Sequence, residues 1–273
     1  MCRHRQYHPR VAVVLVTDAD DPRIADYRNV PDRALVQERR LFVAEGRQVV
    51  RRLLAARRLV TRSILVTAPA LAALDGGFDR ETVTVFVVPQ AVMDAVAGFN
   101  IHRGCLAIGE RPPASDWRVF AGARRLLILE RVANADNVGA AFRNAAAFGA
   151  DAVLLGPGCI DPLYRKSIRT SMAAALNVPF AHLLPWPGAL HELRAAGIRV
   201  IGLSPCASAS SIRAVAATAG PRVAIVGGHE GEGLTRGAME ACDILARIPM
   251  ADGTDSLNVA TAIGIALYEI CGL

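Results

Sequence analysis

Residues 126–155 read LLILERVANADNVGAAFRNAAAFGADAVLL, and this stretch decides the fold of the second half of the chain. The apolar runs at 126–129 and 152–155 are predicted to be strands, and residues 138–148 between them are predicted to be a helix. Continuous apolar strands that are separated by helices predict a parallel sheet covered on both faces.

The alternation of strand and helix continues to the end of the chain. Further strands are predicted at 180–184, 199–203, 223–226 and 244–248, and further helices at 164–175, 188–196 and 258–271. Residues 123–273 are therefore predicted to form an α/β domain. Upstream, the adjacent prolines Pro112 and Pro113 cannot continue a helix or a central strand, so residues 112–122 are predicted to link this domain to residues 1–111.

Residues 1–111 are predicted to form a smaller domain of helices and short strands. Apolar residues recur with approximate helical spacing from Ala34 to Leu59, which predicts one helical region. The remaining surface of this region is basic, with Arg39, Arg40, Arg47, Arg51, Arg52, Arg57 and Arg58. A solvated face and a contact with RNA explain these arginines equally well. Short β-branched runs at 63–67, 82–88 and 105–108 predict strands.

The overall composition permits one large or two modest domains and fits a polyanionic partner. The chain has 273 residues, of which 52% are hydrophobic, so each domain can have its own core. Lys and Arg exceed Asp and Glu by 31 to 25, a formal net charge of +6, and Lys166 is the only lysine. This arginine-rich excess suits RNA phosphates, although a compositional bias of the genome explains it as well.

Cysteines and apolar runs give expectations about compartment, metal and membrane. The six cysteines are scattered, without a CxxC pair or a Cys/His spacing of the zinc type, so we expect reduced thiols in a cytoplasmic protein and no metal site. The apolar run 11–16 is too short for a signal peptide and is followed by Asp18, Asp20 and Asp21. Since about 18 consecutive apolar residues occur nowhere, no membrane span is expected.

Two common nucleotide-binding signatures do not occur in the sequence. A Walker loop requires a glycine-rich loop before its lysine, and Lys166-Ser167 has none. Gly156-Pro157-Gly158 lacks the third glycine of a GxGxxG turn. The candidate site residues are therefore sought in three other clusters.

The first cluster follows the strand at 126–129 and opens the helix at 138–148. Asp136 or Asn137 can cap the helix N-terminus. Arg143 lies about two turns into the helix, where it can hold a phosphate or a developing oxyanion. A capped helix with one arginine is by itself more often structural.

The second cluster, residues 225–234, reads IVGGHEGEGL and is a glycine-dense loop after a strand. Glycines permit positive φ and close approach of the backbone to a ligand. Four glycines around two carboxylates favour a ligand site over a simple turn. His229 is interpreted as solvent-facing or structural rather than as a catalytic base.

The third cluster, residues 248–259, reads IPMADGTDSLNV and precedes the last helix. Ser256 is predicted to be the N-cap of that helix, at a position where helix-terminal amides attract an anion. The helix has few charges, so one broad face is predicted to be buried. Burial against another helix of the chain is the simpler account, and burial against a second subunit is the alternative.

In order and spacing, these clusters resemble the three motifs of the SpoU/TrmH methyltransferases of the SPOUT superfamily. The resemblance covers about residues 123–273 and is carried by an asparagine and an arginine in the first cluster, Gly-x-Glu-Gly-x-Gly-Leu in the second, and Ile-Pro-Met followed by Ser-Leu-Asn-Val in the third. Residues 38–46 and 102–107 are similar to the family's L30e-like substrate-binding domain. Two positions depart from the family: Ala135-Asp136 replaces a frequent Asp-Pro, and Ala260 replaces the serine that usually follows the third motif.

The resemblance implies an α/β fold with a deep trefoil knot in the C-terminal parallel-sheet domain, preceded by a smaller L30e-like domain that binds RNA. It implies S-adenosylmethionine as the cofactor, held by the backbone at Gly228, Ile248 and Leu257. The implied reaction is methyl transfer to a ribose 2′-hydroxyl of tRNA or rRNA. The implied assembly is a homodimer with the final helix in the interface and with the site completed across subunits.

Five residues are expected to serve the reaction. Arg143 is assigned to the reacting ribose and its neighbouring phosphate. Asn137 and Glu230 are assigned to ordering that arginine and the pocket, and Ser256 and Asn258 to the RNA phosphate and the loop of the third cluster. Because a guanidinium stays protonated, the arginine is not expected to be the general base unless a phosphate or water accepts the proton.

Three alternatives stay open from the sequence. The chain can be a knotted RNA-binding protein without methyltransferase activity, although retention of the five residues speaks against this. The acceptor can be a base rather than a ribose. A methyltransferase that confers antibiotic resistance through large-subunit ribosomal RNA is a third alternative.

Overall fold

The computed structural model describes residues 13–28, 31–56, 58–74, 82–97 and 104–271. The chain divides into two compact units, Met1–Pro112 with Leu163–Arg165, and Pro113–Pro162 with Lys166–Leu273. Several residues used in the sequence analysis lie outside the described residues, namely Cys2, Arg57, His102, Arg103 and the start of the apolar run at 11–12.

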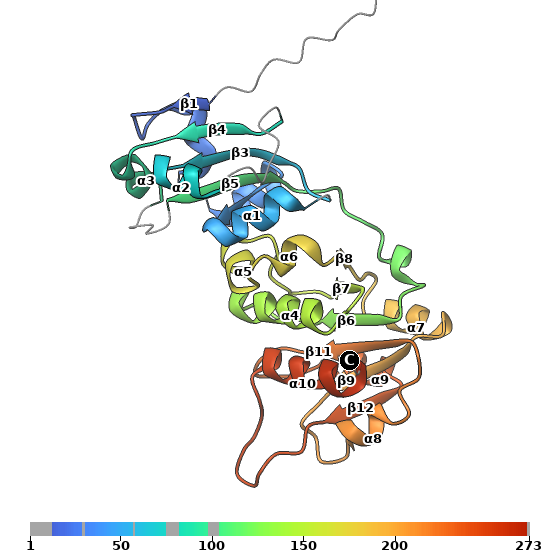
Figure 1. Ribbon diagram of the computed structural model, residues 1–273. Helices are drawn as coiled ribbons and strands as arrows, with labels where there is room; N and C mark the ends of the chain where they lie inside the picture. Colours follow the sequence, from blue (N-terminus) through green and yellow to red (C-terminus); the bar gives the residue numbers. More distant parts are fainter. Residues whose placement is uncertain (1–12, 29–30, 57, 75–81, 98–103, 272–273) are drawn as a thin grey trace, which may run out of the picture. The chain divides into compact units, whose positions relative to one another are not determined.

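The described part of the N-terminal unit contains a mixed five-stranded sheet with helices on both faces (Figure 1). The strands have the order β1-β4-β3-β5-β2, in which β1, β4 and β3 are parallel and β5 is antiparallel to β3 and β2. Their bounds are β1 Val13–Leu15, β2 Leu41–Glu45, β3 Thr61–Val66, β4 Thr84–Val87 and β5 Cys105–Glu110. The helices are η1 Pro22–Tyr27, η2 Ala34–Glu38, α1 Arg47–Ala55, α2 Ala68–Leu74 and α3 Gln90–Ala97.

The single helical region predicted from Ala34 to Leu59 is wrong. Strand β2 divides it into the short helix η2 and the helix α1. Phe42, Val43 and Ala44 are fully buried in β2, which pairs with β5 along its whole length. Residues 41–45 form a strand because they pair with a strand more than 60 residues away, and this pairing outweighs the local helical spacing. The spacing itself arose because the apolar residues of two separate helices were taken as one pattern.

The C-terminal unit contains a seven-stranded sheet in its described residues, and every pair of neighbouring strands is parallel. The strand order is β10-β12-β9-β11-β6-β7-β8. The strands are β6 Arg125–Leu129, β7 Ala152–Leu155, β8 Phe180–His182, β9 Arg199–Leu203, β10 Ser210–Ser211, β11 Val223–Gly227 and β12 Ile244–Arg247. The helices are η3 Trp117–Phe120, α4 Ala135–Ala147, α5 Arg165–Thr170, α6 Ala174–Asn177, α7 Gly188–Ala195, α8 Ile212–Ala216, α9 Arg236–Ala241 and α10 Val259–Cys271. The predicted α/β class with a parallel sheet is confirmed.

Both faces of this sheet are buried, as the largely apolar central strands predict. Leu127 and Leu129 of β6 pack into one core with α4, α6, α8 and α10. Leu126 and Ile128 of the same strand pack into a second core with η3, α7 and α9. The sheet is therefore the middle layer of three (Figure 1).

The helix predicted over 164–175 is in fact two short helices, α5 and α6. Met172 and Ala173, which separate them, have φ values of 50° and 68°. Such left-handed conformations interrupt a right-handed helix, and few sequence signals announce them when the residue is not glycine.

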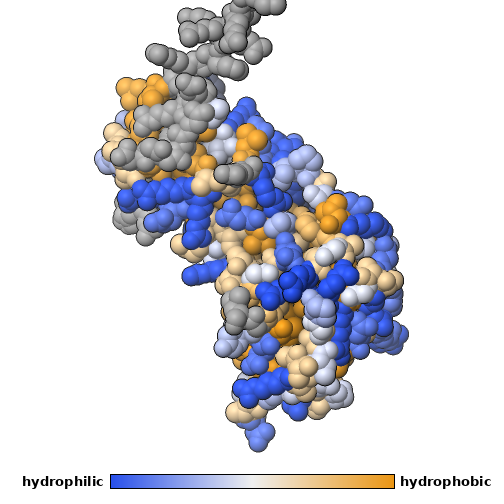
Figure 2. Space-filling model, turned by 45° about the vertical axis from the view of Figure 1, so that its right-hand side comes forward, coloured by the Kyte–Doolittle hydropathy of each residue, from blue (hydrophilic) through white to orange (hydrophobic). Residues whose placement is uncertain are grey.

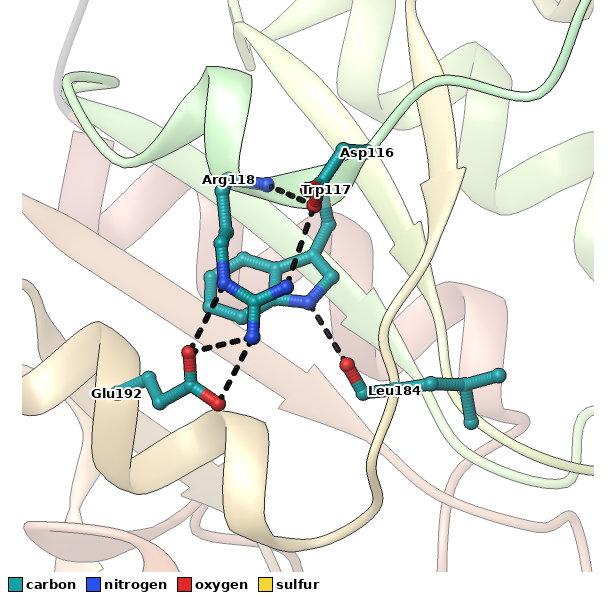
Figure 3. A network of polar contacts seen from close by, with 5 residues as sticks. All are labelled: Asp116, Trp117, Arg118, Leu184 and Glu192. Atoms are coloured by element: carbon teal, nitrogen blue, oxygen red, sulfur yellow. Dashed lines mark hydrogen bonds and ion pairs between the residues drawn. The ribbon is translucent and has the colours of Figure 1, made fainter.

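The segment predicted as a linker, residues 112–122, is anchored to the C-terminal unit by its second half. Trp117 is 4% exposed and donates its Nε1 hydrogen to the carbonyl oxygen of Leu184, at 2.9 Å. Arg118 stacks over the Trp117 ring and pairs with Glu192 of α7 (Figure 3). The indole fills the core beneath α7, which accounts for the order of this proline-rich stretch.

No helix in the described residues is long and apolar enough to span a membrane. On the face shown in Figure 2, hydrophobic areas are small and separated by hydrophilic ones.

Candidate functional site

A cavity of about 430 Å³ lies at the carboxyl ends of β9, β11 and β12. Loops at these strand ends are where open parallel sheets bind ligands. The cavity is lined by Leu203, Ser204, Pro205, Cys206, Gly227, Gly228, His229, Glu230, Gly231, Glu232, Gly233, Leu234, Met239, Ala246, Ile248, Met250, Ser256, Leu257, Val259 and Ala262. Five of the eight predicted site residues are among them: Glu230, Ser256, Gly228, Ile248 and Leu257.

The glycine loop, residues 228–234, folds back on itself beside the cavity. His229 and Gly233 pair through two backbone hydrogen bonds, of 3.1 and 3.0 Å. A Cβ atom on Gly228 would lie 2.4 Å from the carbonyl carbon of Gly233 and 2.5 Å from the nitrogen of Leu234. Glycine at 228 is therefore required by the loop's own backbone, in addition to any approach by a ligand.

His229 has a structural role in this loop, as predicted from the sequence. Its Nδ1 accepts hydrogen bonds from the backbone nitrogens of Gly231, at 3.0 Å, and Glu232, at 3.2 Å. These bonds hold the turn at whose ends Glu230 and Glu232 are exposed. The imidazole nitrogen that accepts them is already in use and cannot also serve as a base.

A chain of side-chain hydrogen bonds joins the three clusters. Asn137 on α4 donates from Nδ2 to Oε1 of Glu230, at 2.9 Å, and its Oδ1 accepts from Nδ2 of Asn258, also at 2.9 Å. Asn137 is 9% exposed, whereas Glu230 and Asn258 are exposed, so both bonds are partly shielded from water. Residues that are far apart in the sequence thus fix the carboxylate of Glu230 at the cavity.

The caps of α4 and α10 differ from those predicted. Asn134, rather than Asp136 or Asn137, caps α4 by accepting from the nitrogen of Asp136 at 2.8 Å. Asn258, rather than Ser256, caps α10 by accepting from the nitrogens of Ala260 at 3.0 Å and Thr261 at 3.3 Å. All these residue types can cap a helix, and the sequence does not say which of several neighbours has the required backbone conformation.

Arg143 is not brought to the cavity within the subunit. It is exposed on α4 and does not line the cavity, and no hydrogen bond or ion pair engages it among the described residues. Position 143 shares a helix face with Asp136, seven residues before it. The carboxylate of Asp136 forms an ion pair with Lys166 at 2.7 Å and accepts a hydrogen bond from Thr170 at 3.0 Å. Both interactions lower the pKa of the Asp136 carboxyl, and the bond to Lys166 has the larger effect.

Three residues that flank or support the glycine loop were not predicted from the sequence: Glu130, Trp186 and Thr235. Glu130 directly follows β6, is fully buried, and accepts hydrogen bonds from the other two residues. A lone carboxylate directly after the four apolar residues 126–129 is the signal that would have singled it out. Beside it, Arg131 pairs with Glu232 of the glycine loop at 2.7 Å.

The cavity combines aliphatic walls with carboxylates at its rim. Leu203, Ile248 and Leu257 supply apolar surface, and Glu230 and Glu232 supply negative charge. This combination suits an organic cation that carries a flat apolar group. In the described part of the chain, no group of His, Cys, Asp and Glu residues is arranged to hold a metal ion.

Cys206 is the one thiol named in the cavity lining. It is exposed, and a hydrogen bond between its Sγ and the hydroxyl of Ser208, at 3.1 Å, lowers the pKa of the thiol. Burial instead raises the pKa of Cys159 to about 11 and that of Cys242 to about 12.

Comparison with known proteins finds similarity along nearly the whole chain. The model of the SpoU rRNA Methylase family matches residues 124–268. An uncharacterised tRNA/rRNA methyltransferase of Mycobacterium tuberculosis is 42% identical over 262 residues, which cover 93% of this chain and 90% of that protein. The structure of an AdoMet-bound rRNA methyltransferase from Sinorhizobium meliloti superposes with a TM-score of 0.80 at 26% identity, covering 94% of this chain and 97% of the other. A crystal structure of an RNA 2′-O ribose methyltransferase superposes with a TM-score of 0.71 at 25% identity, covering 94% and 98%.

Proposed function

Because the chain belongs to the SpoU rRNA methylase family, we propose that it transfers a methyl group from S-adenosylmethionine to a ribose 2′-hydroxyl of tRNA or rRNA. Family membership makes it an S-adenosylmethionine-dependent RNA methyltransferase, and the ribose oxygen as acceptor is what the proposal adds. The observation that carries it is that the second and third motifs line one cavity, while Asn137 of the first motif is hydrogen-bonded to both through Glu230 and Asn258. The similar structure of an RNA 2′-O ribose methyltransferase supports the choice of acceptor.

The cavity fits S-adenosylmethionine in its chemistry. When bound, this cofactor supplies a methyl group on a positively charged sulfur, which leaves as a neutral thioether. The carboxylates of Glu230 and Glu232 complement its positive groups, and the aliphatic walls complement its adenine. The backbone at Gly228, Ile248 and Leu257 is proposed to hold the adenine and ribose, because all three residues line the cavity.

The remaining residues are proposed to position the RNA. Orientation of the attacking oxygen supplies most of the rate enhancement when the donor is already activated. Arg143 would hold the reacting ribose and its phosphate, while Ser256 and Asn258 would hold the RNA phosphate and the loop of the third motif. The proton of the hydroxyl passes to a phosphate oxygen or to water, since a guanidinium cannot accept it.

The wider assembly is also part of the proposal. The N-terminal unit, with its exposed arginines, is proposed to be the L30e-like domain that binds the RNA. A homodimer in the cytoplasm and a trefoil knot in the C-terminal unit are proposed from the family. The homodimer accounts for the position of Arg143 away from its own cavity, because a partner subunit can supply the arginine.

Two measurements test this function. Calorimetric titration with S-adenosylmethionine should give saturable binding, and an absence of heat together with no cofactor carried through purification would favour an RNA-binding protein without activity. Mapping of 2′-O-methyl sites in RNA from a deletion strain should then reveal one lost site that the wild-type gene restores. Loss of a methyl group from a base instead would reject the ribose as acceptor.

Replacement of Arg143 by alanine tests the central residue. We expect methyl transfer to fall by about a hundredfold or more, with an unchanged melting temperature, since the side chain is exposed. Arg143→Lys keeps the charge but not the planar fork, and we expect it to recover little activity. Full methyl transfer by Arg143→Ala would refute the assignment.

A further inference from the structure

Glu130 is a buried carboxylate with three hydrogen-bond donors around it. Its side chain has no solvent exposure. Oε1 accepts from Nε1 of Trp186 at 2.7 Å and from the hydroxyl of Thr235 at 2.6 Å, and Oε2 accepts from the backbone nitrogen of Thr235 at 2.9 Å. Both carboxylate oxygens therefore accept hydrogen bonds, and all three bonds are lost or weakened if the group is replaced.

The carboxylate also fixes the direction of the Thr235 hydroxyl. Because that hydroxyl donates its only hydrogen to Glu130, its oxygen is left to accept from the backbone nitrogen of Ala238, at 3.3 Å. Thr235 is the N-cap of α9, so the same contact sets where that helix begins.

Glu130 holds both ends of the glycine loop. Its backbone nitrogen donates to the carbonyl oxygen of Gly227, at 2.9 Å, immediately before the loop, and its side chain holds Thr235, immediately after the loop. Each residue from Gly228 to Leu234 lines the cavity. Glu130 therefore ties together the two residues that flank the loop, in addition to the backbone bonds between His229 and Gly233 inside it.

Trp186 keeps the carboxylate in place from the other side. A Cβ atom on Gly156 would lie 3.2 Å from the six-membered ring of Trp186, so the indole packs closely over the end of β7. This packing fixes the indole nitrogen that donates to Glu130. The carboxylate cannot turn away from the loop without losing this bond in a site that water does not reach.

We propose that Glu130 is a positioning residue for cofactor binding, which sets the shape of the glycine loop without touching the cofactor. This inference rests on the proposed function, since it takes S-adenosylmethionine as the ligand of the cavity. A residue that only stabilises the fold would lower the melting temperature and leave the affinity of the folded protein for the cofactor unchanged. A positioning residue changes that affinity as well.

Glu130→Gln tests the proposal with the least change of shape. Whichever way the amide is turned, its NH2 group faces a donor, either the Trp186 and Thr235 side chains or the Thr235 nitrogen. We expect the Kd for S-adenosylmethionine, measured by calorimetry well below the melting transition, to rise about tenfold or more. We also expect KM for the cofactor to rise more than kcat falls.

Leu193→Ala is the matched control for stability. Leu193 on α7 is fully buried in the core against which Trp186 packs, but it does not line the cavity. Its truncation should therefore lower the melting temperature without altering the glycine loop. We expect it to keep the wild-type Kd. If Glu130→Gln and Leu193→Ala lose similar stability and both keep the wild-type Kd, the proposal is overturned.

A second pair covers the case in which Glu130→Gln fails to fold. Thr235→Val removes the hydroxyl that Glu130 holds, and Thr235→Ser retains it. We expect the valine variant to bind the cofactor more weakly and the serine variant to bind it as wild type does; equal binding by both would overturn the proposal. Failure of the wild-type protein to bind S-adenosylmethionine would instead reject the proposed function, so the two failures are distinguishable.

Discussion

Asn258 has two separable tasks at the residue scale. Its Oδ1 caps α10, and its Nδ2 donates to Asn137. Asn258→Ala removes both, so we expect it to lower the free energy of unfolding by about 1 kcal/mol and to reduce methyl transfer. Asn258→Asp keeps a capping oxygen but has no amide hydrogen, so we expect near-normal stability with reduced methyl transfer.

Denaturant unfolding and a methyl-transfer assay with the cognate RNA together check this separation. If Asn258→Asp is as active as the wild type, then the bond to Asn137 has no part in the reaction, and the cap alone explains the residue.

Thiol chemistry provides a second test at this scale. The lowered pKa of Cys206 gives it more thiolate at a given pH than an ordinary cysteine, and its exposure admits a reagent. Among the cysteines that the structure describes, we expect iodoacetamide to modify Cys206 first, at lower pH than the half-buried thiols Cys159 and Cys242. Peptide mass spectrometry measures this order.

S-adenosylmethionine should slow the alkylation of Cys206, because this residue lines the cavity. Cys206→Ser provides the control for modification elsewhere. Alkylation at an unchanged rate with saturating cofactor would place the ligand away from this side of the cavity.

The residue types of the site were accessible from the sequence, but their arrangement was not. Short motifs identified Glu230, Ser256 and Gly228, all of which line the cavity. The cap positions were wrong because several neighbouring residues can cap a helix and the sequence does not show which has the required backbone conformation. Glu130 was missed because its hydrogen bonds to Thr235, about 100 positions away, depend on strand order. Strand order is a property of the folded sheet that no local pattern encodes.

At the scale of elements, the glycine loop depends on two glycines to different extents. A Cβ atom on Gly228 would meet the backbone of Gly233 and Leu234 at 2.4–2.6 Å, whereas a Cβ atom on Gly231 would meet only the His229 ring at 3.7 Å. We expect Gly228→Ala to open the loop and abolish measurable cofactor binding. Gly231→Ala should bind the cofactor nearly as the wild type does, because 3.7 Å is an ordinary van der Waals distance.

Calorimetric titration of both variants, with circular dichroism to confirm that each is folded, decides this prediction. Equal affinities for the two would mean that the loop adjusts freely and that its folded-back shape is not required.

Strands that are buried on both faces of the sheet were predicted well, because their continuous apolar sequence clearly indicates a strand of a covered sheet. The strands at 126–129 and 152–155 are near-continuous aliphatic runs, and both occur as β6 and β7. The helices α8 and α9 were missed because each is only five or six residues long and has little room for a periodic pattern. The prediction of one helix from Ala34 to Leu59 was wrong because the apolar residues of strand β2 happened to fit the helical spacing of the residues around them.

At the scale of the whole molecule, sequence periodicity gives the layers but not the path of the chain. Alternating apolar strands and helices are enough to predict the parallel sheet of the C-terminal unit. The trefoil knot stays a prediction from the family, because periodicity is the same for a knotted and an unknotted chain.

The position of Arg143 outside its own cavity leads to a test of the proposed dimer. If each site takes its arginine from the partner subunit, Arg143→Ala and Glu230→Ala are both inactive alone but complement each other when coexpressed. A mixed dimer then has one site with both residues intact and one site with neither. Random assembly makes about half of the dimers mixed, so we expect about one quarter of the wild-type methyl transfer per subunit.

Light scattering on the same samples establishes whether the protein is dimeric at micromolar concentration. An inactive mixture of dimers would mean that Arg143 acts on the cavity of its own subunit, which requires α4 or the glycine loop to move when RNA binds. A monomer would leave Arg143 without a partner subunit, and the cavity would then have to be completed by the RNA itself.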